Sequence, residues 1–140
     1  MNVLFICRAN VGRSQMAEAI FKSLNSTHTA MSAGLNPPMQ WLGQSLDKTK
    51  FVAPCMAEIG IDVTKQISKI ITPEIVSKAD IIIVIGERNG WPDYLTAKTP
   101  LRYWDIPDPD TGEMPLYREV RDNIMCNIKI LLTELDKKTS

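Results

Sequence analysis

The sequence predicts an α/β fold: a single-domain three-layer sandwich with a central four-stranded parallel sheet and helices on both faces. Short, continuously apolar segments, clearest at residues 81–85, are typical of strands buried on both faces of such a sheet. They alternate with segments whose apolar residues recur every three or four positions, as in amphipathic helices. The 140 residues contain no repeat and no linker, so we expect one domain over residues 1–140.

The amino-terminal half of the chain predicts two strands and two helices. Residues 2–6 are an apolar run that begins the sheet, and the apolar positions of residues 13–24 follow a helical spacing. Residues 29–32 suit a second short strand, which is followed by a loop rich in proline and glycine. Residues 51–59 give another helical pattern, and Gly60 should end it with a left-handed cap.

The carboxy-terminal half continues the alternation. Thr72 followed by Pro73 is typical of an N-cap with proline at the first helical position. Residues 81–85, which are all β-branched, predict a strand in the middle of the sheet, and residues 101–104 predict another strand. Residues 117–135 then carry an apolar stripe that predicts one long helix. In this class of fold, ligands bind beyond the carboxyl ends of the strands.

Composition excludes several classes of partner. Sixteen basic residues balance sixteen acidic ones, so no net charge favours nucleic acid or an anionic membrane. The apolar opening is too short for a signal peptide or a membrane span, and we therefore expect a cytoplasmic protein. Three cysteines without paired spacing argue against disulfides, and a single histidine without Cys-x-x-Cys argues against a metal site. We expect no cofactor.

Residues 7–14 join the first predicted strand to the first predicted helix and contain a Cys-x5-Arg pattern. The spacing alone is a weak signal, but main-chain N–H groups and the helix dipole favour an anion at such a junction. A cysteine at a helix N-terminus beside arginine ionises readily, and the thiolate is the reactive form. We therefore expect Cys7 to be a nucleophile and Arg13 to hold two oxygens of a bound phosphoryl group.

The remaining residues of this segment suit an anion-binding loop. Asn10 and Gly12 tolerate positive φ, and Ser14 offers a hydroxyl to the thiolate or to the phosphate. The alternative is that Cys7 is only a small buried residue at a strand end. Arg8 either adds a second positive charge or is a solvated surface arginine. The predicted phosphate-binding residues are Arg8, Ala9, Asn10, Val11, Gly12, Arg13 and Ser14.

These residues resemble the low-molecular-weight protein tyrosine phosphatase family and the thioredoxin-linked arsenate reductases of the same fold. The matching segments run in the family's order along nearly the whole chain: residues 7–18, 32–34, 60–62 and 79–80, Trp104, and Asp108-Pro109. The resemblance implies hydrolysis of phosphate monoesters, such as phosphotyrosine or small aryl phosphates, through a cysteinyl-phosphate. Two positions depart from the family motif, because Ala9 replaces its glycine and Gly12 its second cysteine.

Hydrolysis of a phosphate ester requires an acid that protonates the leaving oxygen. Asp108 is our candidate, because Asp108-Pro109 is the only Asp-Pro pair, follows a predicted strand and matches the acid of the family. Asp105 and Asp110 are alternatives within the same loop, residues 105–115, and a plain solvated turn is a further interpretation. Trp41 either forms an aromatic wall of the site or packs its own loop. Residues 110–112 lack the aromatics that the resemblance implies for many phosphatases of the family, which argues against phosphotyrosyl protein substrates. The expected partner is a phosphorylated small molecule or a phosphotyrosyl protein.

Arsenate has the shape and charge of phosphate, so an arsenate reductase is a second interpretation. The resemblance implies that such reductases use two further cysteines, and the matching positions here hold Gly86 and Trp91. Cys55 and Cys126 lie elsewhere, so Cys7 would need an external thiol to reduce arsenate. A third interpretation is a regulatory protein that binds phosphate, sulfate or arsenate in the loop with little or no turnover.

Overall fold

The computed structural model describes residues 1–97, 100–110 and 112–139. Its four strands form one parallel sheet. The strands are β1 (Asn2–Cys7), β2 (Thr29–Gly34), β3 (Ile81–Ile85) and β4 (Leu101–Trp104), in the order β2-β1-β3-β4. The helices are α1 (Arg13–Leu24), the 3-10 turn η1 (Leu46–Lys48), α2 (Val52–Ala57), α3 (Pro73–Ser77), α4 (Asp93–Thr96) and α5 (Met114–Thr139).

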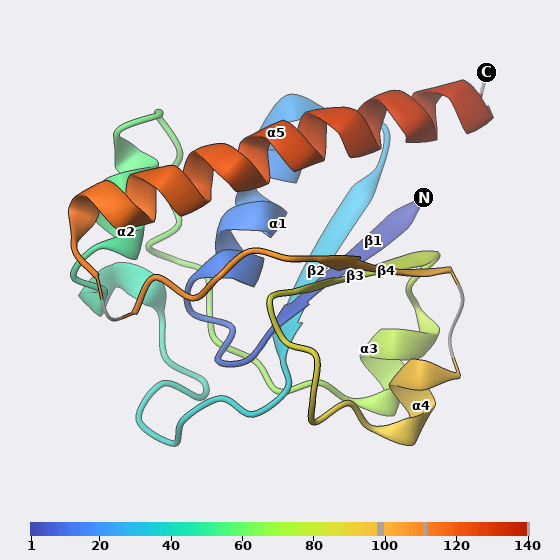
Figure 1. Cartoon of the computed structure of the whole chain (residues 1–140), viewed down its shortest axis with the longest axis horizontal. Helices are drawn as coiled ribbons and strands as arrows, with labels where there is room; N and C mark the ends of the chain where they lie inside the picture. The colour runs from blue at the N-terminus through green and yellow to red at the C-terminus, as the bar shows by residue number, and fades with distance from the viewer. Residues whose placement is uncertain (98–99, 111, 140) are drawn as a thin grey trace.

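Two apolar cores cover the two faces of this sheet. Val3 and Phe5 of β1 pack into a core with α1, α2 and α5, whereas Leu4 and Ile6 pack with α3 and α4 on the other face. This alternation follows from the pleat, which turns successive side chains to opposite faces. Figure 1 shows α1 and α5 on one side of the strands and α3 and α4 on the other. The predicted three-layer α/β sandwich is therefore confirmed.

The register of the sheet brings three loops to one edge. Cys7 pairs with Gly34 at the ends of β1 and β2, and Ile85 pairs with Trp104 at the ends of β3 and β4. Because all four strands are parallel, their carboxyl ends share one edge of the sheet. The segments that follow Cys7, Ile85 and Trp104 therefore meet there.

Most predicted elements lie where the sequence places them. The strands β3 and β4 and the helix α1 have the predicted bounds, and the Thr72 hydroxyl accepts a hydrogen bond from the Ile75 N–H as an N-cap. Helix α2 is shorter than predicted, but Gly60 adopts the expected positive φ of 77°. The short elements η1 and α4 were missed.

The last helix is longer than predicted at both ends, because it begins at Met114 and ends at Thr139. Thr111, within the loop predicted at residues 105–115, lies outside the described residues. Across the described part of the chain, no helix combines the length and apolar character that crossing a bilayer requires.

Candidate active site

Five main-chain carbonyl groups of residues 7–12 accept hydrogen bonds from other parts of the protein. The Cys7 carbonyl accepts from the Leu35 N–H, the Arg8 carbonyl from the Asn36 N–H, and the Ala9 carbonyl from the Ser68 hydroxyl. The Asn10 carbonyl accepts from the Gln15 side-chain amide, and the Gly12 carbonyl accepts from the Met16 N–H. In a trans peptide the N–H points opposite to the C=O. The N–H that follows each of these carbonyls therefore points away from the carbonyl's partner, which is the arrangement that an anion-binding nest requires.

Asn10 is the residue that shapes the loop. Its φ is 55°, a left-handed conformation that asparagine tolerates better than most residues. Its side-chain oxygen accepts hydrogen bonds from the Gln15 amide at 2.9 Å and from the Lys69 N–H at 2.9 Å. Its amide nitrogen donates to the Ser14 hydroxyl at 2.8 Å. Because Asn10, Ser14 and Gln15 are buried, these bonds hold the loop in one conformation.

The Cys7 thiol lies at the base of the loop, buried but lining a pocket. Its Sγ is 3.0 Å from the Ser14 hydroxyl oxygen, which itself takes a hydrogen bond from Asn10. This arrangement leaves the Ser14 proton free to point at the sulfur. Gly34 makes the close packing possible, since a Cβ there would lie 2.7 Å from the Arg8 carbonyl oxygen.

Arg13, at the first turn of α1, is brought to the same pocket and is only 3% exposed. Its Nη1 donates to the Ile106 carbonyl at 2.9 Å, and its Nη2 lies 3.1 Å from Glu87 Oε2. The Asp108 Oδ2 is 3.5 Å from the same Nη2. Among the described residues, Nε has no partner. Since a guanidinium carries five N–H groups, donors remain for a ligand.

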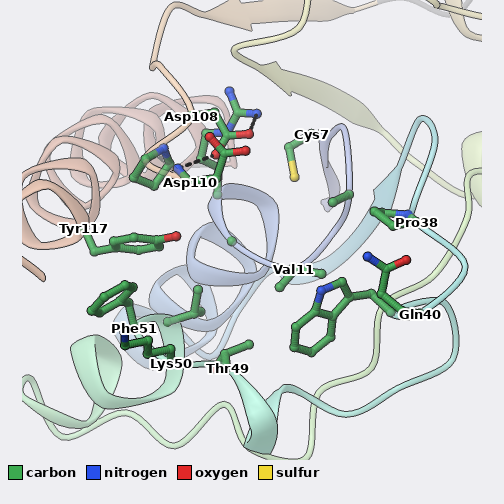
Figure 2. A pocket seen from close by; sticks show the side chains of 16 residues that line it. Cys7, Val11, Pro38, Gln40, Thr49, Lys50, Phe51, Asp108, Asp110 and Tyr117 are labelled. Atoms are coloured by element: carbon green, nitrogen blue, oxygen red, sulfur yellow. Dashed lines mark hydrogen bonds and ion pairs between the residues drawn. The ribbon is translucent and has the colours of Figure 1, made fainter. Parts of the chain in front are cut away.

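Asp108 lies at the mouth of the pocket, in the segment that follows β4. Figure 2 shows Asp108 and Asp110 at the same end of the pocket as Cys7. The Asp108 side chain is 46% exposed, and its Oδ1 accepts a hydrogen bond from the Asp110 N–H at 3.0 Å. Of the two alternative acids, Asp110 also lines the pocket, whereas Asp105 is not among its lining residues.

The pocket has a volume of about 280 Å³ and three aromatic side chains in its walls, Trp41, Phe51 and Tyr117. The rings of Phe51 and Tyr117 are 5.0 Å apart, and the Tyr117 hydroxyl points into the pocket (Figure 2). Burial raises the pKa of Tyr117, and Asp108 and Asp110 raise it further, so this hydroxyl stays protonated. Of the two interpretations of Trp41, the structure favours an aromatic wall.

Sequence reasoning missed Glu87 and the aromatic pair Phe51 and Tyr117. Glu87 is the second residue after the buried strand β3, at the sheet edge where the other site loops lie, and that position was the available signal. Tyr117 was assigned only to the apolar stripe of a helix. The side chain of Arg8 forms an ion pair of 2.6 Å with Glu87 and does not line the pocket.

The other two cysteines lie outside the pocket. Cys55 is buried in α2 with its sulfur 3.7 Å from Arg121, and burial raises the pKa of its thiol. Cys126 is exposed on α5. Gly86 and Trp91 occupy the segment after β3. Among residues 1–97, 100–110 and 112–139, no cluster of three or more His, Cys, Asp or Glu side chains has a metal-binding arrangement.

Comparisons with known proteins give one family. Residues 2–140 match the family model described as low molecular weight phosphotyrosine protein phosphatase. An arsenate reductase of Brevibacillus brevis is 32% identical over 132 residues, which cover 91% of this chain and 90% of that protein. The low molecular weight protein-tyrosine-phosphatase Ptp of Acinetobacter johnsonii is 32% identical over 128 residues, covering 84% of this chain and 86% of that protein.

Solved structures share the fold of this chain. An arsenate reductase in the phosphate binding state has a TM-score of 0.79 and 27% identity, covering 95% of this chain and 97% of that one. The YwlE arginine phosphatase has a TM-score of 0.84 at 22% identity, covering 98% and 97%, and shares the fold. The relatives thus include enzymes named for three different substrates.

Proposed function

Because the chain belongs to the low molecular weight phosphotyrosine protein phosphatase family, we propose that it is a cysteine-dependent phosphatase acting on phosphate monoesters. The observation that carries the proposal is that Cys7 and Arg13, from residues 7–14, line one pocket with Asp108, which lies far along the chain. A nucleophile, a positive clamp and an acid are the groups that phosphoryl transfer to a thiol requires.

In the first step, the Cys7 thiolate attacks phosphorus, and an S–P bond forms as the P–O bond to the leaving group breaks. Asp108 gives its proton to the departing oxygen, so that an alcohol or phenol leaves. Arg13 and the loop N–H groups bind the equatorial oxygens, where charge spreads in the transition state. The Ser14 hydroxyl, 3.0 Å from the sulfur, stabilises the thiolate before attack.

In the second step, water hydrolyses the cysteinyl-phosphate. The Asp108 carboxylate takes a proton from the water as its oxygen bonds to phosphorus. The S–P bond then breaks, and Cys7 returns as a thiolate stabilised by Ser14. Inorganic phosphate leaves, and Asp108 is again protonated for the next turnover.

The pocket favours a small aromatic leaving group. Its volume of about 280 Å³ lies just below the range of typical ligand sites, which is roughly 300–1,000 Å³. The aromatic walls give a phenyl ring flat surfaces to pack on. We propose aryl phosphates as substrates, either phosphotyrosine in a protein or a small molecule. Residues 110–112 lack aromatics, which argued against phosphotyrosyl substrates. The pocket nevertheless has aromatic walls, because Trp41, Phe51 and Tyr117 reach it from other segments.

Arsenate reduction is the second candidate, favoured by the relatives named arsenate reductase. Converting arsenate to arsenite needs two electrons, which two thiols supply as they become a disulfide. Among the described residues that line the pocket, Cys7 carries the single thiol, and burial raises the pKa of the Cys55 thiol and so disfavours its thiolate. An external thiol, such as glutathione, is therefore required for this activity.

Parallel assays separate the candidates. We expect wild type to hydrolyse para-nitrophenyl phosphate and phosphotyrosine, Cys7→Ser to be inactive, and Cys126→Ser to match wild type, since Cys126 is exposed on α5 away from the pocket. Arsenate reduction with glutathione but no ester hydrolysis would favour the reductase instead. Phosphate binding without either activity would mean that the protein is regulatory.

A further inference from the structure

Among the residues that the structure describes, Glu87 is the one carboxylate within hydrogen-bond distance of both Arg8 and Arg13. Its Oε1 lies 2.6 Å from Arg8 Nε, and its Oε2 lies 3.1 Å from Arg13 Nη2. The side chain is only 13% exposed, so these bonds are partly shielded from water. The Trp91 indole donates to the Glu87 carbonyl at 2.7 Å, which fixes the backbone from which the carboxylate projects.

Glu87 and Ile106 together determine how the Arg13 guanidinium is oriented. The Ile106 carbonyl accepts a hydrogen bond from Nη1, and the Glu87 carboxylate accepts one from Nη2. Among the described residues, Nε has no hydrogen-bond partner. A planar guanidinium held at two of its nitrogens cannot rotate about its axis. Its remaining N–H groups therefore keep fixed directions, as two-point recognition of phosphate oxygens requires.

A carboxylate in this place also has a cost. A negative charge beside Arg13 cancels part of the positive field that should attract a phosphate dianion. Arg8 offsets the negative charge of Glu87, because its Nε donates a hydrogen bond to the other oxygen of the same carboxylate. The head group of Arg8 is half exposed and points to Glu87 instead of the pocket.

We propose that Glu87 is a positioning residue for Arg13, and that Arg8 neutralises Glu87 so that Arg13 keeps its charge for the substrate. The proposal rests on the phosphatase function and adds a residue that acts through Arg13 without touching the substrate. Arg8 then assists phosphate binding through Glu87 and not by direct contact.

Two measurements test the proposal on Glu87→Gln, Arg8→Met and the double variant. The first is kcat for para-nitrophenyl phosphate. The second is the concentration of inorganic phosphate that protects Cys7 from iodoacetate, which reports binding without turnover. We expect Glu87→Gln to lower kcat about tenfold, because the guanidinium is held less firmly in the transition state. Its phosphate binding should be unchanged or tighter, since a negative charge is lost. A merely structural role would weaken both.

Arg8→Met should raise the protecting phosphate concentration about three- to tenfold, because the Glu87 charge is then uncompensated. In the Glu87→Gln background the same change should have almost no effect. Arg102→Met is the matched control, since Arg102 pairs with Glu134 of α5, and it should behave as wild type.

Two results would overturn the inference. An equal loss of phosphate binding from Arg8→Met in both backgrounds would mean that Arg8 acts on the ligand directly. Wild-type kcat in Glu87→Gln would mean that Glu87 does not position Arg13. If the wild-type protein binds phosphate but shows no turnover, the phosphatase proposal fails by itself. The phosphate-protection comparison of Arg8→Met in the two backgrounds still decides the role of Arg8.

Discussion

Gly86 is the position where one added methyl group should disable the candidate site. The residue follows β3 directly and has a φ of 71°. A Cβ at this position would overlap Nη1 of Arg13 and the carbonyl oxygen of Ile106, which are hydrogen-bonded to each other. Alanine must therefore displace the guanidinium, the chain that leads to Asp108, or both.

The effect divides into two separable costs. Alanine at positive φ is strained whatever the available space, by about 1–2 kcal/mol. Displacing Arg13 removes donors for charge in the transition state, and losing one comparable donor lowers kcat by about 10²–10³-fold. Gly60→Ala isolates the first cost, because Gly60 has a φ of 77° and a Cβ there meets no heavy atom within 4 Å.

Urea unfolding and hydrolysis of para-nitrophenyl phosphate distinguish the two variants. Gly60→Ala should lose about 1–2 kcal/mol of unfolding free energy and keep its activity. Gly86→Ala should lose at least as much free energy and, in addition, about 10²–10³-fold in kcat. A folded Gly86→Ala protein with the kcat of wild type would refute this description of how Arg13 is seated.

Three further changes probe the acid, the loop and the surface. Asp108→Asn should lower hydrolysis of phenyl phosphate by about 10²-fold or more but that of para-nitrophenyl phosphate by less, because nitrophenolate leaves without a proton; equal losses would argue against Asp108 as the acid. Asn10→Ala should cost about 2–3 kcal/mol in urea unfolding, from strain at its φ of 55° and from lost hydrogen bonds; unchanged unfolding would contradict that role. Hydrogen bonds from Arg118 and then Arg121 lower the pKa of Glu58 from 4.5 to about 2. Its stabilising effect is therefore present above pH 4.5 and lost as the pH falls toward about 2, so the difference in Tm between wild type and Glu58→Gln should shrink over that range. A difference independent of pH would exclude the ion pairs as its cause.

Local signals in the sequence predicted much of the site. A buried strand, a loop and a helix follow one another at residues 2–24, and parallel strands bring the ends of β1 and β4 to one edge. That topology is sufficient to expect Cys7, Arg13 and Asp108 near each other. Their presence in one pocket agrees with the expectation, while their catalytic roles await the assays above.

The rest of the site depends on contacts between segments far apart in the chain. Tyr117 reaches the pocket because α5 begins at Met114, three residues before the predicted start, and so passes beside Phe51. The role proposed for Glu87 follows from its hydrogen bonds to Arg8 and Arg13, which lie more than seventy residues earlier in the chain. No periodicity or motif encodes such a pairing, so it had to be seen in three dimensions.

The most direct test of the account is to identify the phosphorylated residue during turnover. Wild type and Asp108→Asn would be mixed with para-nitrophenyl phosphate, quenched in acid within milliseconds, and mapped by peptide mass spectrometry. We predict a phosphoryl group on the sulfur of Cys7 and on no other residue. Steady hydrolysis without a labelled Cys7, or with the phosphoryl group elsewhere, would contradict the proposed covalent mechanism.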